Sequence, residues 1–232
     1  VVFNDAAIGK VAGKLPKAGA LEVVLYQKAG IGNGDMAGNP WLQEMPDPIS
    51  KVTWDNYITM SPETMKKDGY ATTFDQENGL NMATVKVGGE SITLPVYPSP
   101  GQAAGTIGIA LGYGRGEGNE NIGNAAFVTK EYGGFETDAK GNRVSVGKNA
   151  FRFLTWENGT YQNNVVGSIA KAGNDLYPIA ATQIHHTVMS RNSIVRETTL
   201  DIYQNEEPGA YNHKHVLHTH EGEVPISEFD LW

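Results

Sequence analysis

Cysteine is absent from the 232 residues of this chain. Its absence excludes disulfides, thiolate-ligated zinc, cysteine-ligated iron–sulfur clusters and a cysteine nucleophile within these residues. The sequence also has no run of about 18 apolar residues, the length that a transmembrane helix needs. Positive charge is scarce: 18 Lys and Arg against 26 Asp and Glu give a formal net charge of −8. That balance argues against a general nucleic-acid-backbone binder.

Glycine is abundant instead, with 28 residues. Because glycine is costly inside helices and strands, many tight turns and few long helices are expected. Residues 21–27 are rich in β-branched side chains and predict a buried strand. Residues 82–87 and 91–97 flank Gly88-Gly89, a pattern typical of a β-hairpin. The sequence therefore predicts a mainly β chain, with a barrel or sandwich core and short helical insertions.

The clearest helix runs from Ser61 to Gly69. Ser61 is a favoured N-cap, Pro62 suits the first helical position, and Gly69 ends the helix. Further elements are expected at residues 4–15 (weak helix), 106–111, 151–156 and 165–169 (strands) and 194–203 (short helix).

Residues 39–56 form a proline-rich segment that suits neither a helix nor a strand interior. Its large apolar side chains gain free energy by burial, so we expect them to pin an irregular segment over the core; they are Trp41, Leu42 and Trp54. Asp47 and Asp55 are too far apart in sequence to indicate an acid/base pair. The segment therefore predicts packing and no catalysis.

Gly112-Tyr113-Gly114-Arg115 follows the expected strand at 106–111 and is a candidate binding loop. Exposed backbone N–H groups and one arginine can cradle an anion. A plain tight turn is the alternative. The spacing is not that of a dinucleotide fingerprint, because the third glycine is misplaced and no helix follows.

All six histidines lie between residues 185 and 220. The run formed by His213, His215, His218 and His220 is a candidate transition-metal site, since neutral imidazole suits Zn, Ni or Cu. The alternative is a polar tail that binds metal only adventitiously.

A second histidine group comprises His185 and His186, with Arg191 nearby. Adjacent histidines on a strand face opposite sides, so one of the pair is expected to be buried and hydrogen-bonded. The alternative is contact with an anion or a cofactor edge, with Arg191 binding phosphate.

From Asp201 onward the chain carries seven acids against one base, Lys214. Such a strip is either solvated or a docking surface for a basic partner.

Four blocks of the chain resemble one known family; they are residues 39–69, 85–115, 146–151 and 177–203. They are similar to the C-terminal molybdopterin-dinucleotide-binding domain of molybdopterin oxidoreductases. The similarity points in particular to the large iron–sulfur subunit of bacterial alternative complex III, a membrane quinol oxidoreductase. The resemblance covers most of residues 20–205.

The resemblance implies a double-psi β-barrel with short helical insertions and an irregular C-terminal extension. It divides the chain into a lead-in (1–19), a barrel domain (20–205) and an acidic, histidine-containing tail (206–232). It also implies that the chain is part of a longer subunit, in which a cysteine-rich domain with iron–sulfur clusters follows. The expected location is the periplasmic side of the bacterial inner membrane, with other domains and subunits of the complex as partners.

Function divides at this point between three hypotheses. Residues 70–81 are longer than the connection usual in cofactor-binding relatives, which favours a non-catalytic scaffold that has lost the cofactor. The alternative is a genuine molybdopterin-dinucleotide site, lined by Gly112 to Arg115, His185, His186 and Arg191. The third hypothesis is a metal-binding module built on the histidine run.

Overall fold

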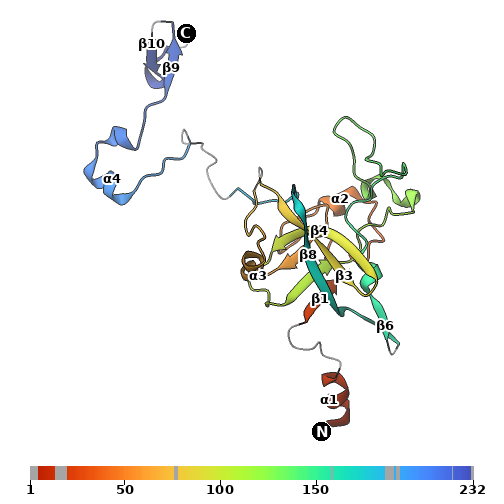
Figure 1. Cartoon of the computed structure of the whole chain (residues 1–232). Helices are drawn as coiled ribbons and strands as arrows, with labels where there is room; N and C mark the ends of the chain where they lie inside the picture. The colour runs from red at the N-terminus through yellow and green to blue at the C-terminus, as the bar shows by residue number, and fades with distance from the viewer. Residues whose placement is uncertain are drawn as a thin grey trace. The chain divides into compact units, whose positions relative to one another are not determined.

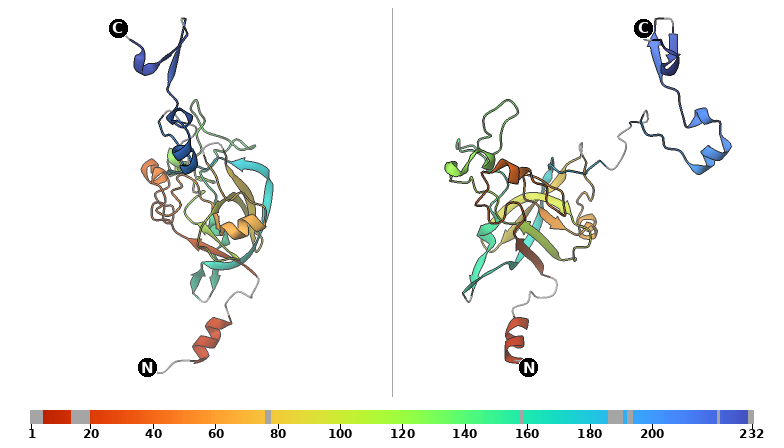
Figure 2. Two further views of the ribbon diagram at one scale, coloured as in Figure 1. Left: turned by 90° about the vertical axis from the view of Figure 1, so that its left-hand side faces the viewer. Right: turned by 180° about the vertical axis from the view of Figure 1, so that it is seen from behind.

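The computed structural model describes residues 5–13, 20–75, 78–157, 159–185, 191, 194–220 and 222–230. The chain divides into two compact units, Val1–Ile184 and His185–Trp232. The division lies within residues 20–205, the range that the resemblance treats as one barrel domain. The first unit contains the main sheet, drawn in Figures 1 and 2.

Six strands of the first unit form a closed barrel. In spatial order they are β1 (Leu21–Tyr26), β5 (Thr106–Ala110), β2 (Ile58–Met60), β4 (Glu90–Pro98), β3 (Leu80–Val87) and β8 (Asn164–Tyr177). The pairs β1–β5 and β2–β4 are parallel, and the other four pairs are antiparallel. Short two-stranded sheets join β6 (Thr155–Glu157) to β7 (Thr160–Gln162) and β9 (Val216–Thr219) to β10 (Gly222–Pro225).

The pairing within the barrel repeats. β1 lies parallel to β5 and antiparallel to β8, and β4 likewise lies parallel to β2 and antiparallel to β3. β2 and β5 pair with each other, as do β3 and β8. The barrel therefore consists of two halves with the same pattern of strand pairing. β1, β2 and β3 of one half correspond to β4, β5 and β8 of the other, because each strand has the same parallel and antiparallel neighbours as its counterpart. The mainly β expectation is confirmed.

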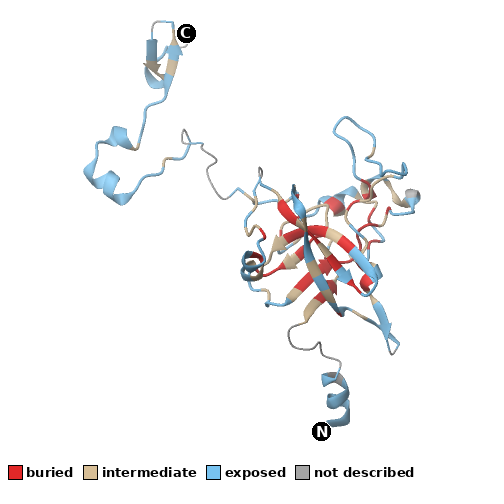
Figure 3. Cartoon of the chain, in the orientation of Figure 1, coloured by how far each residue is buried: buried red, intermediate tan, exposed pale blue. Residues whose placement is uncertain are grey.

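The core fills the interior of this barrel, where Figure 3 shows the buried residues. Buried side chains come from all six strands, from α3 (Pro62–Lys67) and from the 3-10 turn Ala150–Phe153; among the largest fully buried ones are Leu25, Ile58, Met60, Met65, Ile107, Ile109 and Phe153. Burying one such aliphatic or aromatic side chain contributes about 1.5–3 kcal/mol. In the second unit, by contrast, no described residue is buried.

The helices are short: α1 (Asp5–Ala12), α2 (Pro40–Glu44), α3 (Pro62–Lys67) and α4 (Leu200–Asn205). Single 3-10 turns occur at Glu120–Ile122, Asn124–Ala126, Ala150–Phe153, Pro208–Ala210 and Ile226–Glu228. No helix within the described ranges is long and apolar enough to cross a membrane.

The elements expected at 4–15, 21–27, 106–111 and 165–169 are present as α1, β1, β5 and the first part of β8, and two further expectations are confirmed together with their local cause. The helix after Ser61 is present, and the Ser61 hydroxyl accepts a hydrogen bond from the Thr64 N–H at 3.2 Å. The hairpin around Gly88-Gly89 is also present, as β3 and β4.

The expectation for residues 39–56 was wrong in two respects. Pro40–Glu44 is a helix, because proline is tolerated at the first helical position and the Asn39 side chain accepts a hydrogen bond from the Trp41 N–H at 3.0 Å. Trp41 points outward and is 83% exposed. Leu42 and Trp54 are half-buried against a small cluster that contains Ile31 and Tyr113.

Two other expected elements also differ. Residues 150–153 form a 3-10 turn instead of a strand, since the Asn149 side chain caps the Phe151 N–H. The helix expected over 194–203 begins only at Leu200, where Thr199 provides the N-cap.

Candidate functional site

A buried lysine lies just beyond the end of β1. Lys28 is only 7% exposed, and its Nζ donates a hydrogen bond to the backbone carbonyl of Asp55 at 3.3 Å. The same Nζ lies 4.1 Å from the ring centroid of Tyr57 and 5.2 Å from that of Tyr113. Burial lowers the pKa of Lys28 to about 8, against the opposing influence of the Asp47 and Asp55 charges.

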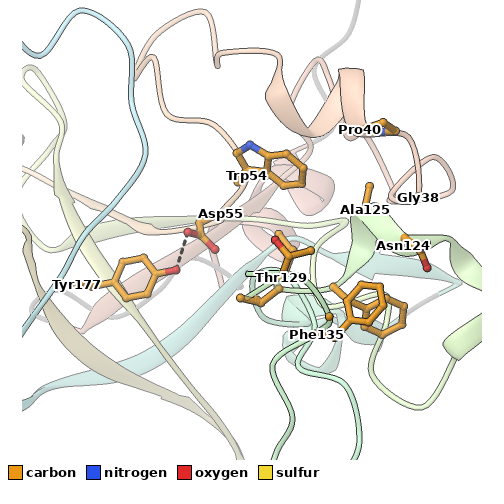
Figure 4. Close-up of a pocket in the computed structure, with 14 residues that line it drawn as sticks. Gly38, Pro40, Trp54, Asp55, Asn124, Ala125, Thr129, Phe135 and Tyr177 are labelled. Carbon is orange, nitrogen blue, oxygen red and sulfur yellow. Dashed lines mark hydrogen bonds between the residues drawn. The ribbon is translucent and has the colours of Figure 1, made fainter. Parts of the chain in front are cut away.

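Asp55 stands between this lysine and the end of β8. The hydroxyl of Tyr177, the last residue of β8, donates a hydrogen bond to Asp55 Oδ2 at 2.7 Å (Figure 4). Burial raises the pKa of the Asp55 carboxyl, while the Tyr177 hydrogen bond and the Lys28 charge act to lower it. Asp55 is therefore a partly desolvated acid that accepts hydrogen bonds from the Tyr177 hydroxyl and from the Gly147 backbone N–H.

Two tyrosine rings lie against this lysine, those of Tyr57 and Tyr113, while Tyr26 is hydrogen-bonded to Tyr57 and Tyr177 to Asp55. Burial raises the pKa of Tyr26 to about 12, and it raises the pKa of Tyr57, Tyr113 and Tyr177 as well. The Tyr57 hydroxyl is hydrogen-bonded to that of Ser50. This cluster consequently combines protonated phenols with one amine whose pKa is lowered.

A pocket of about 630 Å³ opens beside Asp55. Figure 4 shows Trp54, Asp55 and Tyr177 along one side and Asn124, Ala125 and Phe135 along the other. Isolated bridges between Phe127 and Ser145 and between Thr129 and Phe135 fold the second wall back on itself. The volume lies within the roughly 300–1,000 Å³ range of small-molecule sites.

Trp54 is held at this pocket in an unfavourable backbone conformation. Its φ is +65°, in the left-handed region that bulky residues avoid. Its N–H is anchored by a hydrogen bond to the Gln43 carbonyl at 2.8 Å. Such a conformation costs about 1–3 kcal/mol and is characteristic of functional sites.

Sequence reasoning missed the grouping of Lys28, Asp55 and Tyr177. The sequence places a lone lysine just after an apolar strand, which is a weak signal for a buried charge. Nothing local links it to residues 55 and 177, because the barrel brings the three together.

The loop from Gly112 to Arg115 lies against the barrel core and not in an open cradle. Gly112, Tyr113 and Gly114 are buried. The Gly114 N–H donates to the Val146 carbonyl at 2.9 Å, and a Cβ on Gly114 would lie 2.4 Å from the Asn149 nitrogen. A Cβ on Gly112 would similarly meet the Gly32 carbonyl at 2.6 Å. The glycines of this loop thus permit close packing of the chain on itself.

Arg115 is the one cation of that loop. Its Nη2 lies 3.8 Å from Asp35 Oδ1, and its Nε is buried without a hydrogen-bond partner. The loop therefore presents one cationic side chain, but the Gly114 N–H is already bonded within the protein. As an anion cradle for a dinucleotide it fits poorly.

The other residues proposed for that site belong elsewhere in the chain. His185 and Arg191 lie in the unit His185–Trp232, whereas residues 112–115 lie in the unit Val1–Ile184. The Arg191 carbonyl accepts hydrogen bonds from the N–H groups of Ile194 and Val195. His186 lies outside the described residues. The proposed set is not brought together within either unit.

The histidine run lies on and around the β9–β10 hairpin. His218 faces Glu223 on the neighbouring strand, with Nδ1 3.2 Å from Oε1. Arg196 Nη2 lies 2.6 Å from the His213 carbonyl and 3.0 Å from His215 Nε2. His220 directly follows the β9 strand. Within the described ranges, no three His, Asp or Glu side chains are grouped so as to hold a metal ion.

Comparison with protein-family models and with curated proteins finds no match for this chain.

Proposed function

We propose that this chain is a structural domain of a membrane-associated respiratory oxidoreductase subunit, and that it does not hold a molybdopterin cofactor. It would support electron transfer by docking neighbouring iron–sulfur domains and other subunits on the periplasmic side of the membrane. The fold that we propose for it is the double-psi β-barrel. The matching strand neighbours of β1–β2–β3 and β4–β5–β8 support that assignment.

The packing of the Gly112–Arg115 loop carries the scaffold proposal. A cofactor-binding loop must leave backbone N–H groups free for the phosphates of its ligand. Here the Gly114 N–H bonds to Val146, and the space above Gly112 and Gly114 is filled by residues 32 and 149. The loop is thus packed within the protein and leaves little room for a phosphate, which supports a domain without the cofactor.

An assay for pterin and molybdenum on the intact native protein tests this proposal. Pterin is extracted by acid oxidation and measured by fluorescence, with a known molybdopterin enzyme taken through the same procedure as the positive control. We expect neither pterin nor molybdenum at a stoichiometric level. Stoichiometric pterin would overturn the scaffold proposal in favour of a genuine cofactor-binding domain.

The chain of 232 residues offers a second test. A scaffold that needs no cofactor should unfold cooperatively as the apo protein, with a near-ultraviolet circular dichroism signal that disappears at the same midpoint as the far-ultraviolet signal. A molten apo protein, with secondary structure but no near-ultraviolet signal, would contradict the proposal.

Metal analysis tests the remaining hypothesis, that the histidine run is a metal-binding module. Tag-free protein is treated with a chelator, dialysed against zinc and analysed beside a His218→Ala variant. One zinc per chain in the parent and a clear loss in the variant would favour a metal-binding module over the scaffold.

A further inference from the structure

The pocket beside Asp55 carries a single acidic charge in an otherwise apolar and neutral lining. Of its lining residues, Asp55 is the one carboxylic acid, and none is a lysine, arginine or histidine. Its walls include Trp54, Phe127, Phe135 and Val146. A ligand that complements this lining combines an apolar ring with one positively charged donor.

The Asp55 carboxylate retains acceptor capacity. A carboxylate offers about four lone-pair positions; the Tyr177 hydroxyl occupies one on Oδ2, and the Gly147 backbone N–H donates to the carboxylate as well. Lys28 donates to the backbone carbonyl of Asp55 and not to its carboxylate. Among the described ion pairs, none within 4.0 Å involves Asp55. An entering ammonium group would therefore find acceptor positions on Asp55 that no ion pair within 4.0 Å fills, although the charges of Lys28 and Lys148 act on the same carboxylate from farther away.

The aromatic walls favour the same kind of ligand. The face of an aromatic ring attracts a cation that lies within about 6 Å of its centroid. The same rings already attract one cation of the protein: the Arg143 guanidinium lies 4.3 Å from the Phe135 centroid and 5.5 Å from that of Phe127. Arg143 lines the neighbouring groove and not this pocket.

We propose that this pocket binds a small aromatic amine as its ammonium form, with the ammonium group on Asp55 and the ring between Trp54 and Phe135. The strained backbone of Trp54 then has a purpose, because it presents the indole to the pocket. The cavity of about 630 Å³ is large enough for a bicyclic ring with a short side chain. The site is independent of whether the chain belongs to an oxidoreductase.

Three indole probes of similar size separate the contribution of the ligand's charge to binding from that of its aromatic ring. Tryptamine carries an ammonium group, tryptophol carries a neutral hydroxyl in its place, and indole-3-propionate carries a carboxylate. Binding is measured by isothermal titration calorimetry, and the site is located by chemical-shift changes at the Trp54 indole N–H. We expect tryptamine to bind at least about tenfold more tightly than tryptophol, and indole-3-propionate to bind more weakly than either.

Two isosteric variants, one a test and one a control, show whether Asp55 causes the preference for tryptamine over tryptophol. Asp55→Asn should abolish the advantage of tryptamine over tryptophol. Asp175→Asn removes the same charge from an exposed position two residues before Tyr177, and it should leave the advantage intact.

Several results would overturn the proposal. They are equal affinity of the parent protein for tryptamine and tryptophol, no binding of either below about 10 mM, shift changes confined to residues outside the pocket, or an unchanged preference in folded Asp55→Asn. If that variant does not fold, the probe series on the parent protein alone decides.

Discussion

Replacing Lys28 by methionine should remove a rise in stability between pH 8 and pH 10. Lys28 has a folded-state pKa of about 8 against 10.5 for an unperturbed lysine. Between these two values the unfolded chain binds a proton that the folded chain has released. Raising the pH through this window therefore favours the folded state. Methionine has similar length and no proton to lose, so the variant lacks this contribution.

The magnitude follows from the two pKa values. One pKa unit corresponds to about 1.4 kcal/mol, so a difference of roughly 2.5 units gives about 3.4 kcal/mol in full. This figure is the free energy by which the buried charge of Lys28 destabilises the folded state at low pH. Part of that destabilisation remains at pH 10, so the free energy of unfolding rises by about 2 kcal/mol between pH 8 and pH 10. Screening by solvent does not reduce this figure appreciably, because Lys28 is only 7% exposed.

The assay is urea unfolding of the parent, Lys28→Met and Lys86→Met at pH 7, 8, 9 and 10. Lys86 is exposed on β3 and provides the matched control. The upper limit is pH 10 because the buried tyrosines have raised pKa values. Above about pH 9 the unfolded chain begins to lose those protons first, and this lowers the stability of all three proteins alike, so the prediction concerns the difference between them. A parent and a Lys28→Met protein with parallel stability profiles between pH 8 and pH 10 would refute the reasoning.

Three further predictions concern the same barrel. Tyr177→Phe should raise the pKa of the Asp55 carboxyl, because it removes the hydrogen bond that lowers it; carbon-13 NMR titration of the carboxyl measures this, and an unchanged or lower pKa is the contrary result. Gly114→Ala should cost at least about 2 kcal/mol of unfolding free energy through backbone overlap, whereas Gly101→Ala, also at positive φ but in open space, should cost only about 1–2 kcal/mol; equal costs in urea titrations would contradict the packing account. Ser61→Ala should lower stability by about 1 kcal/mol through loss of the N-cap of α3, as measured by thermal unfolding, and a neutral effect would argue against the cap.

Local features of the fold were predictable, because their causes lie within a few residues. The turn at Gly88-Gly89 and the cap at Ser61 needed only the chemistry of neighbouring positions. The prediction failed at Pro40, because proline breaks a helix in its interior but is accommodated at the first helical position, where Pro40 lies. It also went wrong at Trp41, since hydrophobicity alone does not determine which side of a short helix meets the core.

The pocket could not be predicted, because its members come together through the tertiary fold. Asp55 precedes β2 and Tyr177 ends β8, and their hydrogen bond exists only when the barrel is closed. The tight packing of Gly112 and Gly114 is likewise a tertiary property, since it depends on residues 32 and 149. From the sequence alone, the glycines were compatible with an anion cradle as well as with a tight turn.

Closure of the barrel also constrains how the chain is made. β1 leaves the ribosome well before its antiparallel partner β8, which begins only at Asn164. At roughly 5–20 residues per second, synthesis leaves β1 with one unpaired edge for many seconds. Unpaired edges of apolar strands recruit other strands. A nascent chain stalled before β8 should therefore bind chaperones through β1, and release should coincide with the appearance of β8.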